Sequence, residues 1–201
     1  MRQLNNSLPD ELEKILSSLD FEENGGLFID SIQTSGKDLK VCFKLRLSDD
    51  KNDQQWIIKI TGNIAERIVL TYTHTLQLFS DHELLWDYTD SHTELYFKGK
   101  SKNPYHLYKD LYKLHNRPFN DGMLETYING PDGVFKLCES GFGLFARGPK
   151  KMLEQYKKCL EKHDVQANYM GDYPAEEKDL KLLFFGESYF IGKDFEFERI
   201  S

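Results

Sequence analysis

A long apolar run and a cysteine framework are both missing from this 201-residue chain, and each absence excludes a class of protein. No apolar stretch approaches the roughly 20 residues that cross a bilayer, and residues 1–6 lack the apolar core of a secretory signal. The three cysteines, Cys42, Cys138 and Cys159, are widely spaced and form no C-x-x-C pair, which argues against a disulfide scaffold or a paired-cysteine zinc site. We expect a soluble cytoplasmic protein with reduced, mostly buried thiols and no membrane association.

Basic residues are fewer than acidic ones, with 26 Lys and Arg against 33 Asp and Glu, a net charge of −7. The surplus lies in residues 1–100, which hold 17 acidic and 11 basic side chains, whereas residues 101–201 hold 16 and 15. An acidic surface disfavours non-specific binding to nucleic acid or to anionic membranes. It accounts for solubility and is compatible with a basic protein partner. The sequence does not specify an oligomeric state.

Length and composition indicate one globular domain over residues 1–201, because 39% apolar residues in a chain of this length can form a sizeable core. An alternative is two lobes. Residues 98–103 would then be the boundary, since this polar, Gly-containing segment stands directly before an Asn-Pro helix start.

Alternation of apolar and polar residues over 39–47 predicts a strand with one wet face. Turn-rich segments on both sides predict that 27–34 and 55–60 pair with it as a meander. A further alternating run, 67–79, predicts a fourth strand, with His74 in register with the apolar residues and therefore in the core. Ahead of the meander, a leucine and isoleucine stripe predicts a helix over 8–19.

The remaining elements are predicted from shorter signals. Helical stripes follow prolines at 104–115 and at 149–163. Strands are expected at 165–170, 180–185, 188–191 and around 195–197, and two aromatic segments, 84–88 and 94–97, are candidate edge strands. The fold class is therefore α+β, a mostly antiparallel sheet of an N-terminal meander plus C-terminal strands, with about three helices packed on it.

Residues 139–151 contain the pattern G-x-G-x-x-A of a dinucleotide-binding turn, at Gly141, Gly143 and Ala146. That fingerprint requires a strand at 134–138 and an unbroken helix beginning near Gly143. Gly148-Pro149 would interrupt such a helix at a cost of roughly 3 kcal/mol. We therefore interpret the segment as a strand that ends in a turn, with a new helix beginning at Pro149.

The same segment contains a candidate anion site, because basic residues surround the start of a predicted helix, where backbone amides attract negative charge. The alternative is that the lysines of this helix form a solvated face paired with its glutamates. The candidate residues are Arg147, Gly148, Lys150 and Lys151.

Potential metal ligands are densest in residues 81–94, where His82, Asp87, His92 and Glu94 are candidates for a hard cation. The two histidines are ten residues apart, and the segment lacks the second histidine of H-E-x-x-H. A polar loop beside a sheet is the alternative interpretation. No cofactor is expected.

Nucleophile motifs are also incomplete, since Gly186-Glu187-Ser188-Tyr189-Phe190 has phenylalanine where G-x-S-x-G requires glycine. The sequence therefore favours a binding protein over an enzyme. We expect an inhibitor or immunity-type protein that acts by protein contact and carries its acidic surplus toward a basic partner. The alternative is a small metal-assisted hydrolase or a phosphoester-binding enzyme.

Overall fold

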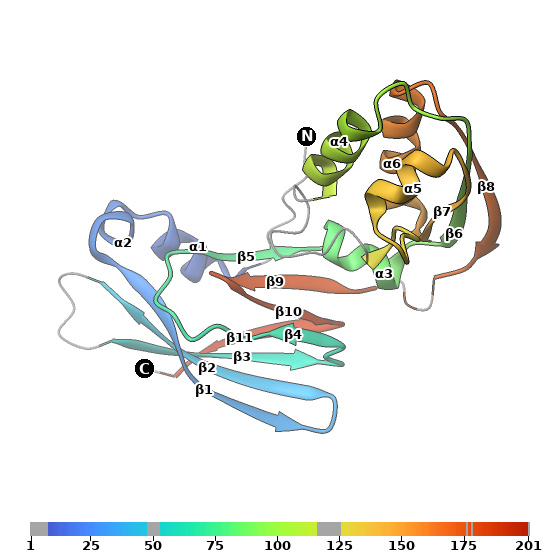
Figure 1. The fold of residues 1–201 in the computed structure, drawn as a ribbon. Helices are drawn as coiled ribbons and strands as arrows, with labels where there is room; N and C mark the ends of the chain where they lie inside the picture. Colours follow the sequence, from blue (N-terminus) through green and yellow to red (C-terminus); the bar gives the residue numbers. More distant parts are fainter. Residues whose placement is uncertain (1–7, 48–52, 116–125, 176, 178, 201) are drawn as a thin grey trace. The chain divides into compact units, whose positions relative to one another are not determined.

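The chain forms two compact units in a computed structural model that describes residues 8–47, 53–115, 126–175, 177 and 179–200. Unit 1 consists of Met1–His82 and Asp179–Ser201, and unit 2 of Glu83–Lys178. Unit 2 is thus inserted into unit 1 between two of its strands, β5 and β9 (Figure 1). Residues 98–103, the predicted lobe boundary, connect a strand to a helix inside unit 2.

The helix predicted over 8–19 is present but shorter, and a second short helix that the sequence did not predict follows it. They are α1 (Asp10–Leu16) and α2 (Leu19–Asn24). Ser18 separates them because its hydroxyl accepts a hydrogen bond from the Phe21 backbone N–H at 3.3 Å, which caps the second helix. Each helix contributes to the core of unit 1, through Leu12 and Phe21.

Unit 1 contains two antiparallel four-stranded sheets, and the first confirms the predicted meander. Its strand order is β1 (Gly26–Ser35), β2 (Asp38–Arg46), β3 (Gln54–Thr61) and β11 (Asp194–Arg199). The second has the order β4 (Ala65–Arg67), β10 (Ser188–Gly192), β9 (Lys181–Phe185) and β5 (Leu76–Phe79). The strands predicted at 180–185 and 188–191 are β9 and β10, which pair as an antiparallel hairpin.

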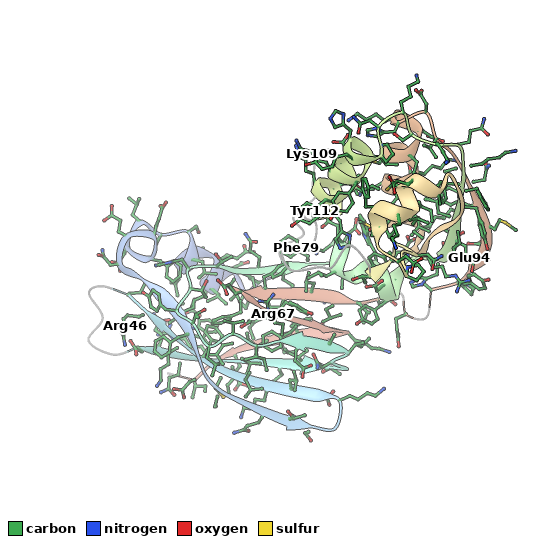
Figure 2. All side chains as sticks on the ribbon, viewed as in Figure 1. Arg46, Arg67, Phe79, Glu94, Lys109 and Tyr112 are labelled. Atoms are coloured by element: carbon green, nitrogen blue, oxygen red, sulfur yellow. The ribbon has the colours of Figure 1, made fainter. Side chains whose placement is uncertain are left out.

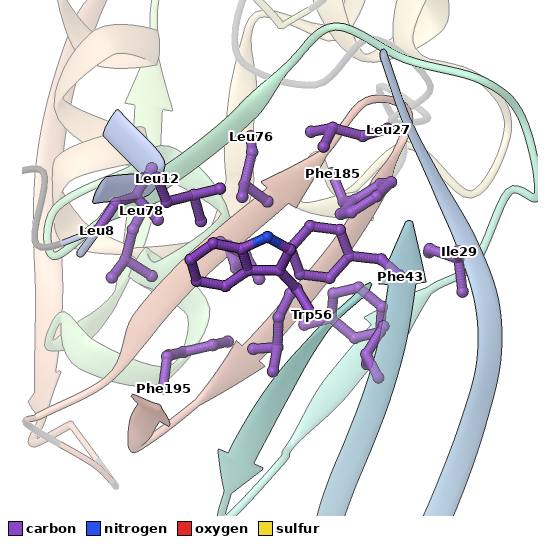
Figure 3. Close-up of a cluster of buried hydrophobic side chains, with 14 of the residues drawn as sticks. Leu8, Leu12, Leu27, Ile29, Phe43, Trp56, Leu76, Leu78, Phe185 and Phe195 are labelled. Carbon is purple, nitrogen blue, oxygen red and sulfur yellow. The ribbon is translucent and has the colours of Figure 1, made fainter. Parts of the chain in front are cut away.

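An aromatic cluster in the core of unit 1 joins its two sheets (Figure 3). Phe43 of β2 stacks on Trp56 of β3, with ring centroids 6.4 Å apart, and meets Phe185 of β9 edge-on at 5.5 Å. All three side chains are buried. Such pairs add to the free energy gained from apolar burial, so this cluster holds the sheets of unit 1 together.

The prediction of a strand over 67–79 was wrong, because only its two ends join the second sheet. In between, the Ser188 hydroxyl bonds both the N–H of Val69, at 2.8 Å, and its carbonyl oxygen, at 3.0 Å, in place of a strand neighbour. Leu70, Tyr72 and His74 are exposed. His74 is therefore not the core residue that its register predicted.

Unit 2 contains a three-stranded antiparallel sheet with the order β7 (Phe142–Pro149), β6 (His92–Lys98) and β8 (Gln166–Tyr173). The strand predicted at 94–97 is confirmed, but it is the central strand β6 and not an edge strand. The helical elements of unit 2 are η1 (Glu83–Leu85), α3 (Trp86–Thr89), α4 (Pro104–His115), α5 (Val134–Ser140) and α6 (Lys150–Lys162).

The described part of the chain forms six α-helices rather than about three. The stripes at 104–115 and 149–163 correctly predicted α4 and α6, whereas α2, α3 and α5 have seven residues or fewer. Elements this short have too few turns to show a period in sequence. The segment 84–88, predicted as an edge strand, forms η1 and most of α3 instead. None of the described helices has the length and apolar character needed to cross a membrane.

Helices cover only one face of the unit 2 sheet. α4, α5 and α6 lie on the same side of it (Figure 1), and their buried residues form one cluster with those of the strands. Leu95 and Phe97 of β6 point into this cluster, where Leu111 and Tyr156 are also buried. The opposite face carries the alternate residues of each strand and has no described helix on it.

Asp110 links α4 to the end of α6. Its Oδ2 lies 2.9 Å from Lys162 Nζ and 3.1 Å from His163 Nε2. Hydrogen bonds from these two groups lower the pKa of Asp110 from 3.8 to about 2.

Asp110→Asn is expected to destabilise unit 2 by about 1 kcal/mol or less at neutral pH, because the pair is partly exposed. The native pKa lies below the unfolded value, so the carboxylate stabilises the fold above about pH 4 and loses that contribution as the pH falls toward 2. Urea unfolding followed by tryptophan fluorescence measures the difference in free energy of unfolding. A Trp56→Phe background is used so that the signal comes from Trp86 of unit 2 alone. Exposed Asp132→Asn is the control, and a deficit for Asp110→Asn that persisted at pH 2 would contradict the assignment.

Candidate functional site

A pocket of about 310 Å³ in unit 2 brings together most residues of the two predicted sites. Asp87, His92 and Glu94, predicted as metal ligands, line it together with Arg147 and Gly148 of the predicted anion site. The remaining lining residues are Thr93, Tyr173, Pro174 and Ala175. His82, the fourth metal candidate, belongs to unit 1.

The strand register places a set of partly exposed side chains on the face that the helices leave uncovered. Residues directly opposite in antiparallel strands share a face, so the pairings form rows across β7, β6 and β8. One row is Arg147–Glu94–Met170, the next is Leu144–Tyr96–Asn168, and His92 pairs with Tyr173. A third row is Phe142–Lys98–Gln166. We call this surface the open face, defined by Phe142, Lys98, Gln166, Leu144, Arg147, Glu94, Tyr96, Asn168, Met170 and Tyr173.

An ion pair lies at the centre of the open face. Arg147 Nε is 2.8 Å from Glu94 Oε1, and the Tyr96 hydroxyl donates to Glu94 Oε2 at 3.0 Å. This hydrogen bond is the main cause of the raised pKa of Tyr96. Glu94 is far less exposed than Arg147, with side-chain exposures of 21% and 66%. Figure 2 shows Glu94 on the side of the sheet away from Tyr112 and Lys109 of α4. The carboxylate thus holds Arg147 on the open face.

Three of the four predicted metal ligands meet in the pocket but do not form a metal-binding group. His92 Nε2 lies 3.0 Å from the Asp87 carbonyl oxygen, so this nitrogen carries the proton. The Asp87 carboxylate accepts a hydrogen bond from Tyr127 at 2.7 Å, and Glu94 holds Arg147. Among the residues that the structure describes, no three acidic, histidine or cysteine side chains are grouped to hold a metal ion.

The start of α6 already contacts a negative charge, which comes from the chain itself. Asp90 Oδ2 accepts a hydrogen bond from the Lys151 backbone N–H at 2.6 Å, and the Ser91 carbonyl accepts one from Lys150 N–H at 2.8 Å. The Lys151 ammonium lies 5.7 Å from the Trp86 ring centre. The predicted anion site requires a bound anion to accept hydrogen bonds from the amides at this helix start, and the Asp90 carboxylate already accepts one, from Lys151. An external anion would therefore have to displace Asp90.

Gly148 has a structural reason to be glycine. Its φ is +153°, and a Cβ built there would lie 2.6 Å from the ring of Tyr127. That ring is held because Tyr127 accepts a backbone hydrogen bond from Arg147 and donates its hydroxyl to Asp87. Burial, and then the bond to Asp87, raise the pKa of Tyr127. Gly148 therefore lets the Tyr127 ring pack directly against the backbone of β7.

The dinucleotide pattern has another explanation as well. The strand that it would need at 134–138 is helix α5, which ends at Gly141 in the left-handed conformation. Gly143 and Ala146 then belong to strand β7. The strand-to-helix junction at Pro149, predicted instead, is confirmed.

Sequence reasoning missed the roles of Tyr96, Asp90 and Tyr173, although it counted Asp90 among the potential metal ligands of residues 81–94. The period-two alternation of His92, Glu94 and Tyr96 was available as a signal for one face of a strand. Asp90 and Tyr173 had no comparable signal, because their contacts are made with residues more than 60 and 80 positions away in the chain.

No protein-family model, curated protein or solved structure matches this chain. The function must therefore be argued from the geometry of the described residues.

Asp90→Ala is expected to destabilise unit 2 by about 1 kcal/mol, because it leaves an amide at the start of α6 without its acceptor. Hydrogen exchange should become faster in the first turn of α6 and stay unchanged in strand β2 of unit 1. Asp132→Ala, an exposed acidic residue of the same unit, is the control. Unchanged exchange at Lys151 would show that Asp90 does not cap the helix.

Burial makes two of the three thiols unreactive. It raises the pKa of Cys138 to about 12 and that of Cys159 to about 11. Native protein treated with a thiol reagent near pH 8 should therefore label half-buried Cys42 first and the other two only in urea. Cys42→Ser should abolish the fast phase. Rapid labelling of native Cys159 would contradict its burial.

Proposed function

We propose that this chain is a protein-binding module, of the inhibitor or immunity type that the sequence predicted, and that it contacts its partner through the open face of unit 2. The observation that carries the proposal is that exposed large apolar side chains share this face with the Arg147–Glu94 pair. Phe142, Met170 and Tyr173 are 74%, 58% and 56% exposed; Met170 lies opposite Glu94, and Phe142 lies two rows away, opposite Lys98.

This arrangement is typical of protein interfaces. Aromatic residues, methionine and arginine are enriched in the parts of interfaces that contribute most to affinity. A regular sheet also offers a rigid platform, so binding orders few additional groups. The pocket beside the ion pair adds a recess that a side chain of the partner could enter.

The acidic surplus belongs almost entirely to unit 1, which carries 18 acidic and 12 basic residues, a net of −6. Long-range attraction between opposite net charges raises association rates, and shorter contacts then set the dissociation rate. A basic partner would accordingly be attracted by the chain as a whole and held by the open face.

The enzymatic alternatives have less support. A metal-assisted hydrolase needs a ligand set that the described residues do not assemble. A phosphoester-binding enzyme needs backbone amides at a helix start, and those of Lys150 and Lys151 are already hydrogen-bonded.

Phe142→Ser combined with Met170→Ser is expected to reduce capture of a specific partner at least about tenfold, because the open face loses its two most exposed apolar side chains as contact area. Immobilised protein and an extract of the producing cells provide the measurement, with bound proteins identified and quantified. Stability should change by no more than about 0.5 kcal/mol, since both residues are exposed.

Leu70→Ser is the matched control. Leu70 is 73% exposed and lies outside the strands of unit 1. Capture that falls equally with this control, or that survives the double substitution, would overturn the assignment of the open face.

A further inference from the structure

We propose that the partner binds by strand addition, as an extended segment that pairs with the free edge of β8 and carries apolar residues on one face and basic residues on the other. This inference rests on the proposed function and specifies how the same sheet recognises its partner.

The two edges of the unit 2 sheet differ in their protection. Along β7, residues 127–129 run beside the strand, where Arg147 N–H donates to the Tyr127 carbonyl at 2.9 Å and Asn129 N–H to the Phe145 carbonyl at 2.7 Å. β8 forms the other edge, and within the described residues β6 is its only strand neighbour. Backbone groups on the outer side of such a strand can pair with another chain.

β8 also has few of the features that protect edge strands from pairing. It has eight residues, is longer than most strands, and contains neither proline nor lysine in QANYMGDY. An irregularity in the register interrupts only the end nearest Tyr173. Residues 166–170 therefore offer a regular template for an added strand.

A groove runs beside this template, between β8 and α6. Its volume is about 470 Å³, and Lys157, Glu161, Asp164, Val165, Gln166, Ala167 and Asn168 line it. A strand laid in a groove between a strand and a helix gains affinity from backbone hydrogen bonds and specificity from alternate side chains.

The two faces of an added strand would meet different surroundings. Side chains on one face would continue the open face beyond Met170, which is apolar and 58% exposed. Side chains on the other would face α6, where Lys157 and Glu161 line the groove. Period-two alternation in the partner follows from this difference.

The helix side of the groove favours positive charge. Glu161 is 52% and Asp164 is 70% exposed, and each pairs with a lysine of the chain, Glu161 with Lys157 at 3.8 Å and Asp164 with the exposed Lys102 at 3.0 Å. A basic side chain of the partner would bind here by replacing these lysines. Lys157 is less available, because its ammonium lies 5.0 Å from the Tyr169 ring centre and its side chain is 28% exposed. Glu154 and Glu161 are also near enough to Tyr169 to add to the effect of burial in raising its pKa. Basic side chains therefore suit this face of the partner.

The test uses a peptide of alternating lysine and valine, acetyl-KVKVKVKV-amide, whose length matches the eight residues of β8. Hydrogen exchange of the full chain is measured with and without it. We expect exchange of the β8 amides to slow at least about tenfold while α4 is unchanged. The block peptide acetyl-KKKKVVVV-amide has the same composition without the alternation, and acetyl-EVEVEVEV-amide reverses the charge. Both should bind at least about tenfold more weakly.

A charge variant provides a second measurement. Glu161→Gln with Asp164→Asn should weaken binding of the lysine–valine peptide about threefold to tenfold and leave the fold intact, since both side chains are exposed. Asp132→Asn with Glu139→Gln, which removes two exposed charges near α5, is the matched control and should bind as the wild type does.

Several outcomes would overturn strand addition. They are unchanged β8 exchange with the peptide, equal binding of the block peptide, and β8 protection that rises with protein concentration alone, which would assign the edge to a second copy. A partner whose capture needs Phe142 and Met170 but resists a saturating lysine–valine peptide would leave the proposed function standing and remove this inference. If capture of the partner did not depend on Phe142 and Met170 but the lysine–valine peptide still protected β8, the proposed function would be overturned and strand addition would stand.

Discussion

The antiparallel pairing of β5 with β9 is the constraint on which the rest of the structure depends. Phe79 and Leu182 lie opposite each other in this pair, and the chain between the two strands includes all of unit 2. These two strands can therefore pair only if the first and last residues of unit 2 lie close together. Closing a long flexible loop costs conformational entropy, and a folded insert with neighbouring ends lowers that cost. The stability of unit 1 is in this way linked to the folding of unit 2.

Within unit 2, the position of β6 at the centre of the sheet organises the candidate site. Its alternate residues face opposite sides, so Leu95 and Phe97 enter the core while His92, Glu94 and Tyr96 reach the pocket or the open face. β7 then supplies Arg147 opposite Glu94, and Gly148 admits the ring of Tyr127. Two sets of candidates that seemed unrelated along the chain, one near residue 90 and one near residue 147, meet because these strands are neighbours.

Sequence patterns correctly predicted the elements whose structure depends on residues within the element itself. Alternation at 39–47 identified β2 with its neighbours, and Pro149 identified the start of α6, because both signals lie within the element itself. The pattern failed for Arg67–Phe79, where the alternation is real but Ser188, 119 positions from Val69, replaces a strand neighbour. It also failed to predict the position of β6 in the sheet, because the sequence HTELYFK does not indicate whether the strand has one neighbouring strand or two. Asp90 at the α6 start could not be predicted for the same reason, as its contact crosses 61 positions.

Because the helices cover a single side of the unit 2 sheet, stability and recognition fall on different residues of the same strands. Leu95, Phe145 and Ala167 are fixed by the packing of the core, whereas Phe142, Met170 and Asn168 contribute little to it. Substitutions at the second set can accumulate without the destabilisation that usually limits sequence change. Such a surface can follow an evolving partner residue by residue while the fold beneath it stays the same.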